Sequence, residues 1–314
     1  KEDKTGRGSD AYKRDFWNIM RKKNVPVTNA LQVGTDSEGG YLVPDEFEHQ
    51  IIEGLEDENI LRKISKTIRT SYGEKLIPVA TTKGTASWIA EEGAYEESDV
   101  AFGQVTLGAH KLGTMIKISE ELLNDSAFNM ENYIAREFSR RIGIKEEEAF
   151  LIGDGVGKPT GILSESEGAE VSTTSSSATK LTFDELIDLY YSIKEGYRKR
   201  SVFLMHENTL KTIRKLKDQN GQYIWQPSVS LGEPDRILSC PVYTSSFIPE
   251  LAASNKTVLF GDFSFYWIAD RQGRTFKRLN ELYATNGQVG FLGSQRVDAK
   301  LILPEAIKAI KQGA

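Results

Sequence analysis

One short segment, Gly153-Asp-Gly-Val-Gly-Lys-Pro159, combines residue types that bind phosphate in nucleotide-binding loops. Such a loop needs a glycine where Ile152 stands and a serine or threonine where Pro159 stands, and it should follow a strand, whereas the pattern before it is helical. The segment is therefore interpreted as a glycine cap that ends a helix. Turns follow, in which glycine supplies positive φ and Pro159 prevents the helix from resuming.

The histidines and the cysteine do not form a pattern typical of a metal site. His49, His110 and His206 each lack a second histidine or cysteine at ligand spacing. Cys240 is the only cysteine in the sequence, and its neighbours Ser239 and Pro241 supply no cation that would activate a thiol. We expect no metal and no other cofactor, and we interpret Cys240 as a small buried apolar side chain.

Neighbouring carboxylates are the remaining candidates for catalysis. Glu120 with Glu121, and Glu146 to Glu148, could act as general acids and bases, but both groups follow a helical surface pattern that solvation explains better. The sequence contains no Gly-x-Ser-x-Gly nucleophile elbow. A protein that is not an enzyme is favoured, and a soluble α+β enzyme with paired carboxylates in a cleft stays open as an alternative.

The composition is typical of a globular protein of about two domains. The chain has 314 residues, of which 39% are hydrophobic and 27% charged, and no apolar run approaches the ~20 residues of a membrane span. The net charge is −5, yet residues 1–24 are basic, with eight Lys or Arg and four Asp or Glu. Such an arm could bind nucleic acid, but its mixed signs favour an acidic patch on another subunit.

Two helices are predicted in the first half of the chain. Asp45 and Glu48 have capping-box spacing and start a helix over 45–57. An apolar row at every fourth residue predicts the longest helix, over 128–151: Met130, Ile134, Phe138 and Ile142. Arginines interleave with glutamates along this helix, which indicates a solvated or subunit-facing side with i, i+4 ion pairs.

The second half alternates strand and helix patterns and indicates an α+β chain without internal repeats. Thr182 and Glu185 form a capping box that starts a helix running to about Gly196. The other predicted elements are a Ser/Thr-rich loop over 172–179, strands over 201–206, 257–260, 264–268, 288–292 and 297–303, and helices over 207–218 and 304–311.

An acidic excursion lies between Lys83 and Lys111, a stretch without Lys or Arg. Its acidic residues are Glu91, Glu92, Glu96, Glu97 and Asp99. Strand-like runs flank this cluster but hold few large apolar side chains, so a hairpin made from them could bury little by itself. We expect this hairpin to lie against a partner, most simply a neighbouring copy of the same chain.

The order of several motifs resembles the major capsid proteins of tailed bacteriophages with the HK97-type fold. The motifs that carry the resemblance are Gly39-Gly-Tyr-Leu-Val-Pro44, Trp88-Ile-Ala-Glu-Glu-Gly93, Phe102-Gly-Gln-Val-Thr-Leu107, Ile118-Ser-Glu-Glu-Leu-Leu123, Phe150-Leu-Ile-Gly-Asp-Gly155, Leu259-Phe-Gly-Asp-Phe263, Tyr266-Trp-Ile-Ala-Asp270, Gln288-Val-Gly-Phe291 and Arg296-Val-Asp298. Each motif alone is weak evidence for the family, but so many motifs in the same order are specific. Together they cover nearly all residues from about 36 to the end.

The resemblance implies an α+β subunit with a peripheral domain, built on a long spine helix and a sheet, and an axial domain that meets its copies around capsomer centres. The implied parts are an N-terminal arm (1–35), the peripheral domain (36–179) with an extended hairpin called the E-loop (74–118) and the spine helix (128–151), the axial domain (180–270), return strands and a loop of the peripheral domain (271–296) and a C-terminal axial segment (297–314).

The implied function is mechanical. Copies of the chain would assemble as pentamers and hexamers into an icosahedral shell around a double-stranded DNA genome, in the virion and, during assembly, in the host cytoplasm. Expected partners are other copies, a portal, a scaffolding protein or maturation protease, the packaged DNA without sequence specificity and possible decoration proteins, but no membrane. Family members often lose a segment ahead of the arm, which is consistent with a sequence starting at Lys1. An encapsulin-like compartment is the alternative.

Some family members weld their shells with isopeptide bonds between a hairpin lysine and an asparagine, assisted by a glutamate. Here Tyr95 stands at the lysine position and Gly293 at the glutamate position, and only Asn286 matches, so we expect non-covalent contacts. Asn286 is interpreted as a turn residue beside Gly287. The candidates for contact between subunits are Glu91, Glu92, Tyr95, Glu96, Glu97 and Asp99 of the hairpin, Arg136, Arg140 and Arg141 of the spine helix, and Lys22 and Lys23 of the arm.

Overall fold

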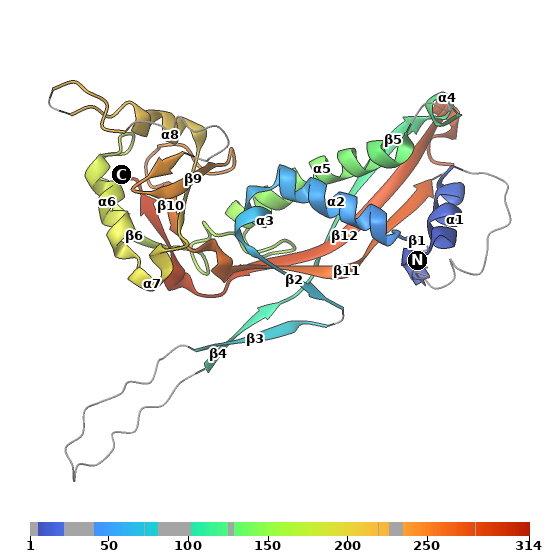
Figure 1. Ribbon diagram of the computed structural model, residues 1–314, viewed down its shortest axis with the longest axis horizontal. Coiled ribbons are helices and arrows are strands. Elements are labelled where there is room, and N and C mark those ends of the chain that lie inside the picture. Colours follow the sequence, from blue (N-terminus) through green and yellow to red (C-terminus); the bar gives the residue numbers. More distant parts are fainter. Residues whose placement is uncertain are drawn as a thin grey trace, which may run out of the picture.

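The computed structural model describes residues 6–21, 41–71, 73–80, 102–124, 129–218, 220–225, 235–279 and 281–314. Within these ranges the chain forms two sheets that lie side by side along the long axis of the molecule, and a separate two-stranded hairpin that stands away from them (Figure 1). Two long antiparallel strands, β11 (Tyr266–Leu279) and β12 (Gln288–Leu301), pair with each other at the centre of the first sheet.

The first sheet has five strands in the order β1-β11-β12-β5, with β2 also pairing with β11. The added strands are β1 (Tyr41–Leu42), β2 (Lys66–Thr70) and β5 (His110–Ser119). A register shift interrupts β11 between Arg271 and Thr275, where Gly273 has a φ of +104°. Glycine tolerates this left-handed conformation without strain, so the strand bends there and continues.

Helices cover one face of this sheet. They are α1 (Asp10–Met20), α2 (Asp45–Glu58), α3 (Ile60–Ile64), α4 (Glu120–Asn124) and α5 (Met130–Ile152). Phe47, Phe138 and Phe276 are fully or almost fully buried and bring α2, α5 and the sheet into one core. The helices α2 and α5 approach closely because Gly54 faces Ser139, whose Oγ would lie 2.6 Å from an added Cβ.

The second sheet has six strands in the order β6-β13-β10-β7-β9-β8. They are β6 (Glu170–Thr174), β7 (Val202–Met205), β8 (Arg236–Ile237), β9 (Cys240–Thr244), β10 (Lys256–Gly261) and β13 (Ile307–Lys311). Its helices are α6 (Phe183–Ser192), α7 (Glu195–Arg198) and α8 (Glu207–Arg214). Single turns of 3₁₀ helix lie at Gly6–Gly8, Phe263–Phe265, Ala284–Asn286 and Pro304–Ala306.

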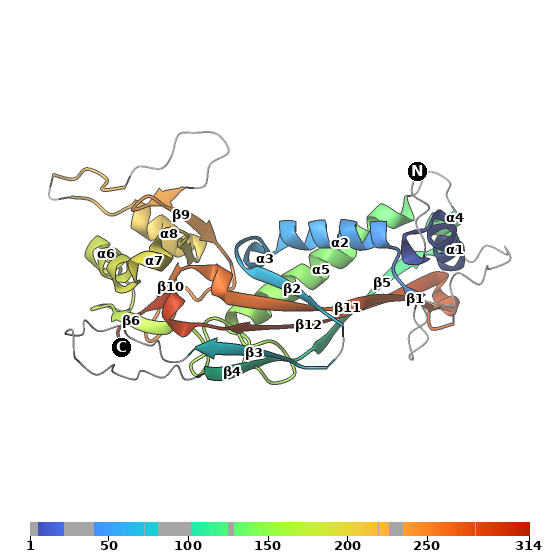
Figure 2. The same cartoon turned by 60° about the horizontal axis from the view of Figure 1, so that its bottom comes forward.

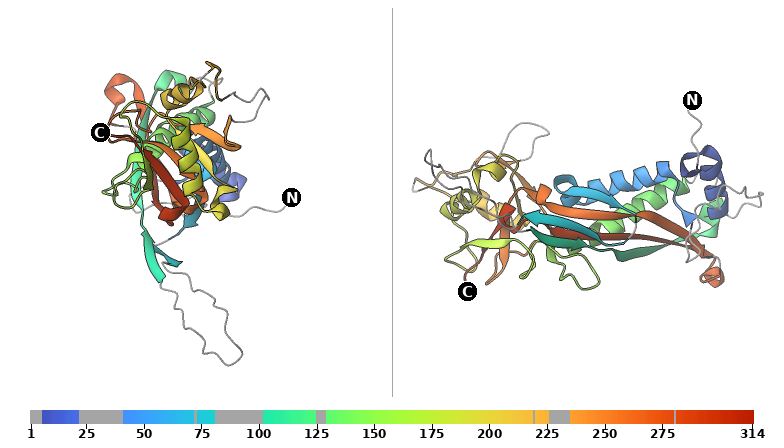
Figure 3. Two further views of the ribbon diagram at one scale, coloured as in Figure 1. Left: turned by 90° about the vertical axis from the view of Figure 1, so that its left-hand side faces the viewer. Right: turned by 90° about the horizontal axis from the view of Figure 1, so that it is seen from below.

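The hairpin consists of β3 (Lys75–Ala80) and β4 (Phe102–Leu107), which pair with each other as a separate sheet (Figure 2). The predicted hairpin over 74–118 is too long at its second end, because β5 turns away from β4 and joins β12 of the first sheet. Seen from below, β3 and β4 lie over the long strands, and they pair only with each other (Figure 3).

Several sequence predictions about elements are confirmed. The helices expected over 45–57 and 128–151 are α2 and α5, and Thr182 and Glu185 form the predicted capping box at the start of α6. The capping box expected from Asp45 and Glu48 is wrong, because α2 starts after Pro44 without a side-chain cap and Glu48 pairs with Arg274. Cys240 is buried, and burial raises the pKa of its thiol, as its interpretation as a small apolar side chain requires.

Other predictions about elements are wrong, and strand pairing is the common reason. The terminal stretch 304–311 is one 3₁₀ turn followed by β13, because Ile307 to Lys311 pair with β10 on one side and β6 on the other. The predicted loop over 172–179 begins with the end of β6 for the same reason. The strands predicted over 288–292 and 297–303 are one continuous strand, β12, which pairs along its length with β11.

Two predicted helices are shorter than their sequence patterns. The helix expected from Thr182 to Gly196 is interrupted at Ile193, which has an extended conformation and is buried, so that α6 and α7 are separate. The helix expected over 207–218 ends at Arg214, and Lys217 forms an isolated bridge with Tyr223.

Candidate functional site

A small apolar cluster anchors the hairpin to the body of the protein. Ile77 of β3 and Leu107 of β4 are buried against Ala269 and Ile302, with partly buried side chains around them. The cluster lies at the root of the hairpin, where β4 leads into β5. The root of the hairpin is therefore buried against its own chain, and the predicted contact of the hairpin with a neighbouring copy stays a prediction.

Polar contacts fix the direction in which the hairpin leaves the body. Asp298 of β12 accepts a hydrogen bond from the backbone N–H of Gly108 at 2.6 Å, and its other oxygen lies 3.6 Å from Nε2 of His110. Arg271 donates to the carbonyl oxygen of Gly73. Both ends of the hairpin are thus tied to the first sheet, one by a carboxylate and the other by a guanidinium.

A buried network of charges lies beneath this root and joins three elements. Arg62 of α3 donates to Glu146 of α5 at 2.7 and 2.9 Å and to Asp270 of β11 at 2.9 and 3.0 Å. Arg274 donates to Asp270 at 3.1 Å and to Gln295 at 2.8 Å. Each guanidinium thus bridges separate segments, because its planar donors match carboxylate geometry.

The network continues outward to the N-terminal segment. Arg274 also donates to Glu48 of α2 at 3.1 Å, and Arg7 lies 3.3 Å from the same carboxylate and 3.2 Å from Asp45. A chain of alternating charges thus connects the centre of the molecule with residues 6–8. Lys13 of α1 reaches Glu46 at 2.6 Å, so two basic residues of the predicted arm have partners within their own chain.

Burial and pairing set the protonation of this network. Burial alone would lower the pKa of Arg62, but Asp270 and Glu146 raise it well above its usual value, so the guanidinium is charged. Burial raises the pKa of Glu146. Burial also opposes ionisation of Asp270, but Arg62 and Arg274 outweigh it and hold the pKa of Asp270 below its usual value. Each carboxylate has a cationic partner, so the network holds α3, α5 and β11 together.

Sequence reasoning misplaced the acidic residues at the end of the spine helix. Glu146 and Glu147 were expected to be solvated, yet they are only 1% and 7% exposed. Glu147 accepts a hydrogen bond from Ser245 Oγ at 2.5 Å and so links α5 to the segment after β9. Burial raises the pKa of Glu147, and the hydrogen bond only partly offsets this.

The arginines predicted to face another subunit lie on the outer side of α5. Glu137 pairs with Arg141 at i, i+4 and with Arg140 at i, i+3, at 3.0 and 3.2 Å, which confirms the predicted ion pairs along this helix. Arg141 also donates to the carbonyl oxygen of Met115. Arg136 is exposed and lines a groove of 330 Å³ between α2 and α5, beside Asp57.

The other predicted contact residues lie outside the described residues. These are Glu91, Glu92, Tyr95, Glu96, Glu97 and Asp99 of the hairpin, and Lys22 and Lys23 of the arm. Their contacts with a second copy stay predictions.

The two described positions of the cross-linking pattern have local roles. Asn286 ends a 3₁₀ turn, and Gly287 after it has a φ of +60°, which is the geometry of a turn. At Gly293, an added Cβ would lie 2.7 Å from Phe138 Cδ2 and 2.9 Å from Phe276 Cε1. Two core rings thus occupy the space in which a glutamate side chain would start.

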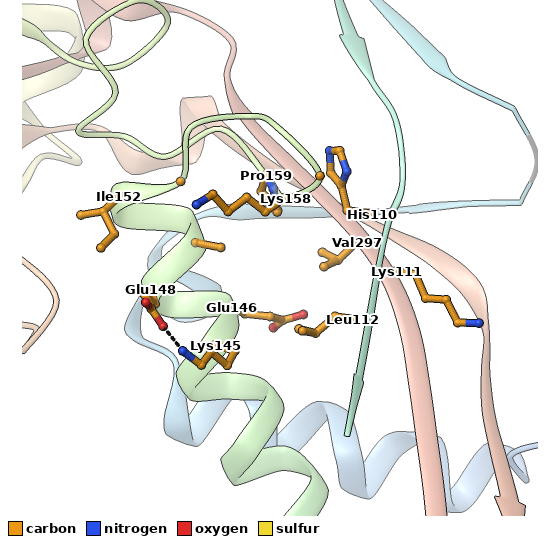
Figure 4. Close-up of a pocket in the computed structure, with 13 residues that line it drawn as sticks. His110, Lys111, Leu112, Lys145, Glu146, Glu148, Ile152, Lys158, Pro159 and Val297 are labelled. Atoms are coloured by element: carbon orange, nitrogen blue, oxygen red, sulfur yellow. Dashed lines mark hydrogen bonds and ion pairs between the residues drawn. The ribbon is translucent and has the colours of Figure 1, made fainter. Parts of the chain in front are cut away.

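The glycine-rich segment borders a pocket of 270 Å³ between α5 and β5 (Figure 4). Gly153 caps α5, and the backbone N–H of Val156 donates to Asp154 Oδ1, which leaves it unavailable to a phosphate. Lys158 pairs with Asp154 at 3.3 Å, and Lys145 pairs with Glu148 at 2.6 Å. The segment is a cap followed by glycine turns, and its geometry is not that of a phosphate-binding loop.

Within the described ranges, no group of three or more His, Cys, Asp or Glu side chains is placed to hold a metal ion. No helix in those ranges is long and apolar enough to cross a membrane.

Comparisons with known sequences place the chain among capsid proteins. A model of the phage capsid family matches residues 39–312. The major capsid protein of Klebsiella oxytoca phage phiKO2 is 30% identical over 132 residues, which are 42% of this chain and 31% of that protein. The major capsid protein of Enterobacteria phage HK97 is 24% identical over 238 residues, which are 74% and 59%. The matches thus span less than two thirds of these relatives.

Solved structures agree with this placement. The capsid of a native GTA particle superposes with a TM-score of 0.71 and is 30% identical, over 81% of this chain and 90% of that one. A structure from Mycobacterium phage Cain superposes with a TM-score of 0.59 at 14% identity, over 95% and 98%, and shows likeness in fold alone. These neighbours confirm the predicted α+β fold of the HK97 type.

The relatives also decide between a structural protein and an enzyme. Those from Enterobacteria phage HK97 and Escherichia phage T5 are both named major capsid proteins. The prediction that this chain is a structural protein is thereby confirmed, and the alternative of a soluble enzyme loses its support. With a family match that covers residues 39–312 and a fold shared with capsid subunits, the chain belongs to the phage capsid family.

Proposed function

We propose that the chain is the repeating subunit of an icosahedral phage shell, assembled as pentamers and hexamers around double-stranded DNA. The observation that carries this proposal is the hairpin of β3 and β4, which pairs with neither of the two larger sheets and, among its described residues, buries Ile77 and Leu107 at its root. A hairpin of this kind gains stability from a partner outside its own chain, and a closed shell supplies the same partner to every copy.

We further propose that the acidic tip of the hairpin contacts the spine helix or the arm of a neighbour. The tip carries Glu91, Glu92, Glu96, Glu97 and Asp99, with Tyr95 among them, and the candidate cations are Arg136, Arg140, Arg141, Lys22 and Lys23. The exposed Arg136 supports this pairing. Reversal of the charge at Glu96 and Glu97 should impair assembly, and assembly without loss would contradict the contact.

The shell contacts in this proposal are non-covalent. The division into an arm (1–35), a peripheral domain with the first sheet and an axial domain with the second sheet belongs to the same proposal. A portal, a scaffolding protein or maturation protease and decoration proteins would act during or after assembly, which would take place in the host cytoplasm. The packaged DNA would meet the shell without sequence specificity, because the net charge of −5 limits adhesion to phosphates.

Electron cryo-microscopy of particles isolated from the native source tests this proposal. We expect closed icosahedral particles with density for packed DNA inside and one vertex that differs from the others. Particles filled with folded protein cargo would instead identify an encapsulin-like compartment and contradict the DNA-enclosing role.

A further inference from the structure

Two helices lie on one face of the second sheet, near opposite borders of its strand order. The helix α6 contacts β6 and β13 at one end of the strand order, whereas α8 connects the parallel neighbours β7 and β9 towards the other end. Both helices bury apolar side chains in the same cluster, so they cover one face of the sheet. With strands spaced about 4.8 Å apart, the two helices are roughly 15–20 Å apart. Figure 1 shows α6 and α8 on separate borders of this part of the molecule.

The outer side of α6 is acidic. Asp184 and Asp188 are both exposed and stand four residues apart, so they lie on one stripe of the helix. The helix contains no Lys or Arg. Basic residues that follow it have partners within the chain, because Lys194 pairs with Glu305 and Arg200 with Asp262.

The outer side of α8 is basic at its end and has the same spacing, whereas the exposed Glu207 lies in its first turn. Lys211 and Lys215 are exposed and also stand four residues apart, at the end of the helix. Other cations beside them are engaged within the chain, since Arg214 pairs with Asp235 and Lys217 lies over the ring of Tyr223.

The four residues of these two stripes have no ion-pair partner within the described part of the chain. Favourable interaction with helix dipoles accounts for Asp184 in the first turn of α6 and for the lysines at the end of α8. It does not account for Asp188 in the second turn, because the dipole effect falls off within the first turn. Two acidic and two basic groups with equal spacing, near opposite borders of one sheet, are complementary in charge between one copy and the next.

We infer that the α6 side of one copy contacts the α8 side of the next copy, with Asp184 and Asp188 facing Lys211 and Lys215. Such a contact is head-to-tail, because the two surfaces differ, and repeated head-to-tail contacts close into a ring. This inference rests on the proposed function and identifies a surface through which rings form. Ion pairs in this contact set the order and orientation of the copies more than the total affinity.

Charge reversal on one side, and then on both, tests the contact. We expect Asp184→Lys/Asp188→Lys to reduce the assembled fraction of the full chain about tenfold at low salt, and Lys211→Glu/Lys215→Glu to do the same. The fourfold variant restores complementary charges and should assemble to within about twofold of the unmodified chain. Asp184→Asn/Asp188→Asn is the matched control without repulsion and should give an intermediate loss. Circular dichroism and thermal unfolding verify that each variant is folded.

Mixing the two double variants tests ring formation directly. The first double variant has two basic sides and the second has two acidic sides, so neither should form rings alone, whereas an equal mixture should form rings in which the two alternate. Alternation closes with six copies but not with five, so the mixture should give hexamers and no pentamers by native mass spectrometry.

The outcomes separate this contact from the proposed function. If the unmodified chain forms shells and both double variants form them equally well, the contact is wrong and the shell function stands. A folded fourfold variant that does not assemble also contradicts the contact. If the unmodified chain remains small, the proposed function and this contact both fail.

Discussion

The guanidinium of Arg62 in α3 lies 2.7 Å from the carboxylate of Glu146 in α5, although the two residues are 84 positions apart in the sequence. Asp270 of β11 contacts the same guanidinium from a position 208 residues beyond Arg62. Three segments of the first sheet and its helices thus meet at one buried charge.

Replacement of Arg62 should lower the free energy of unfolding more than most single substitutions in this fold. Arg62→Met leaves Glu146 and Asp270 buried beside each other without their shared cation, and we expect a loss of about 3–5 kcal/mol in the free energy of unfolding. Urea denaturation followed by circular dichroism measures it. The control is Arg140→Met on the exposed side of α5, which should leave the unfolding midpoint close to that of the unmodified chain. A loss below about 1 kcal/mol for Arg62→Met would contradict the role of this network.

Any larger side chain at Gly293 should lower the stability of the fold. In Gly293→Ala the new methyl group enters the space of Phe138 and Phe276, and overpacking of this kind costs about 1–3 kcal/mol. Thermal unfolding measures the loss. Gly196→Ala is a matched control, because an added Cβ meets nothing within 4 Å there, and it should leave stability unchanged or raise it. Equal midpoints for the two variants would show that the rings can move aside.

Glu147 gives the fold a dependence on pH whose sign follows from its burial. Its folded pKa is raised above the ordinary value of 4.5, so the stability it contributes is present below pH 4.5 and is lost as pH rises through the folded pKa. Glu147→Gln keeps an oxygen that accepts from Ser245 and removes the charge. We expect the variant to gain stability relative to the unmodified chain as pH rises from 4.5 to 8, in urea titrations at each pH. A constant difference between the two chains across this range would contradict the raised pKa.

The hairpin should be dispensable for folding and necessary for assembly. Ala80 and Phe102 are cross-strand partners, so replacement of residues 81–101 by Asn-Gly gives a tight turn between β3 and β4. We expect the shortened chain to unfold at nearly the same temperature as the full chain and to remain unassembled when examined by negative-stain microscopy. Normal shells from the shortened chain would show that the segment is not a contact between subunits.

Covalent welding of the shell is not expected. Boiled and reduced particles should give one band at the monomer mass of 35.1 kDa in denaturing electrophoresis. A ladder of higher bands would mean that residues outside the pattern of Tyr95, Asn286 and Gly293 form the bonds.

Local patterns predicted α2, α5 and the start of α6, and the physical reason is visible in the core. Ile134, Phe138 and Ile142 recur at helical spacing because one face of α5 is buried against the sheet. The capping box of Thr182 and Glu185 satisfies its hydrogen bonds within four residues, so sequence alone was sufficient to find it.

Features that depend on distant partners were not predictable in the same way. The segment Ile307–Lys311 has no period that separates helix from strand, and only its pairing with β6 and β10 decides. Glu146 resembles any glutamate of an exposed helix until Arg62 is placed beside it. One signal was available: Glu146 follows Ile142 by four residues and so continues the apolar stripe, which indicates a buried position.

The central claim is that this chain is a shell subunit, and the mass of the purified full-length protein in solution tests it most directly. Multi-angle light scattering should give a species of megadaltons, as expected for hundreds of copies of a 35.1 kDa chain. A single species of tens of kilodaltons, at every concentration and salt condition tried, would contradict the account.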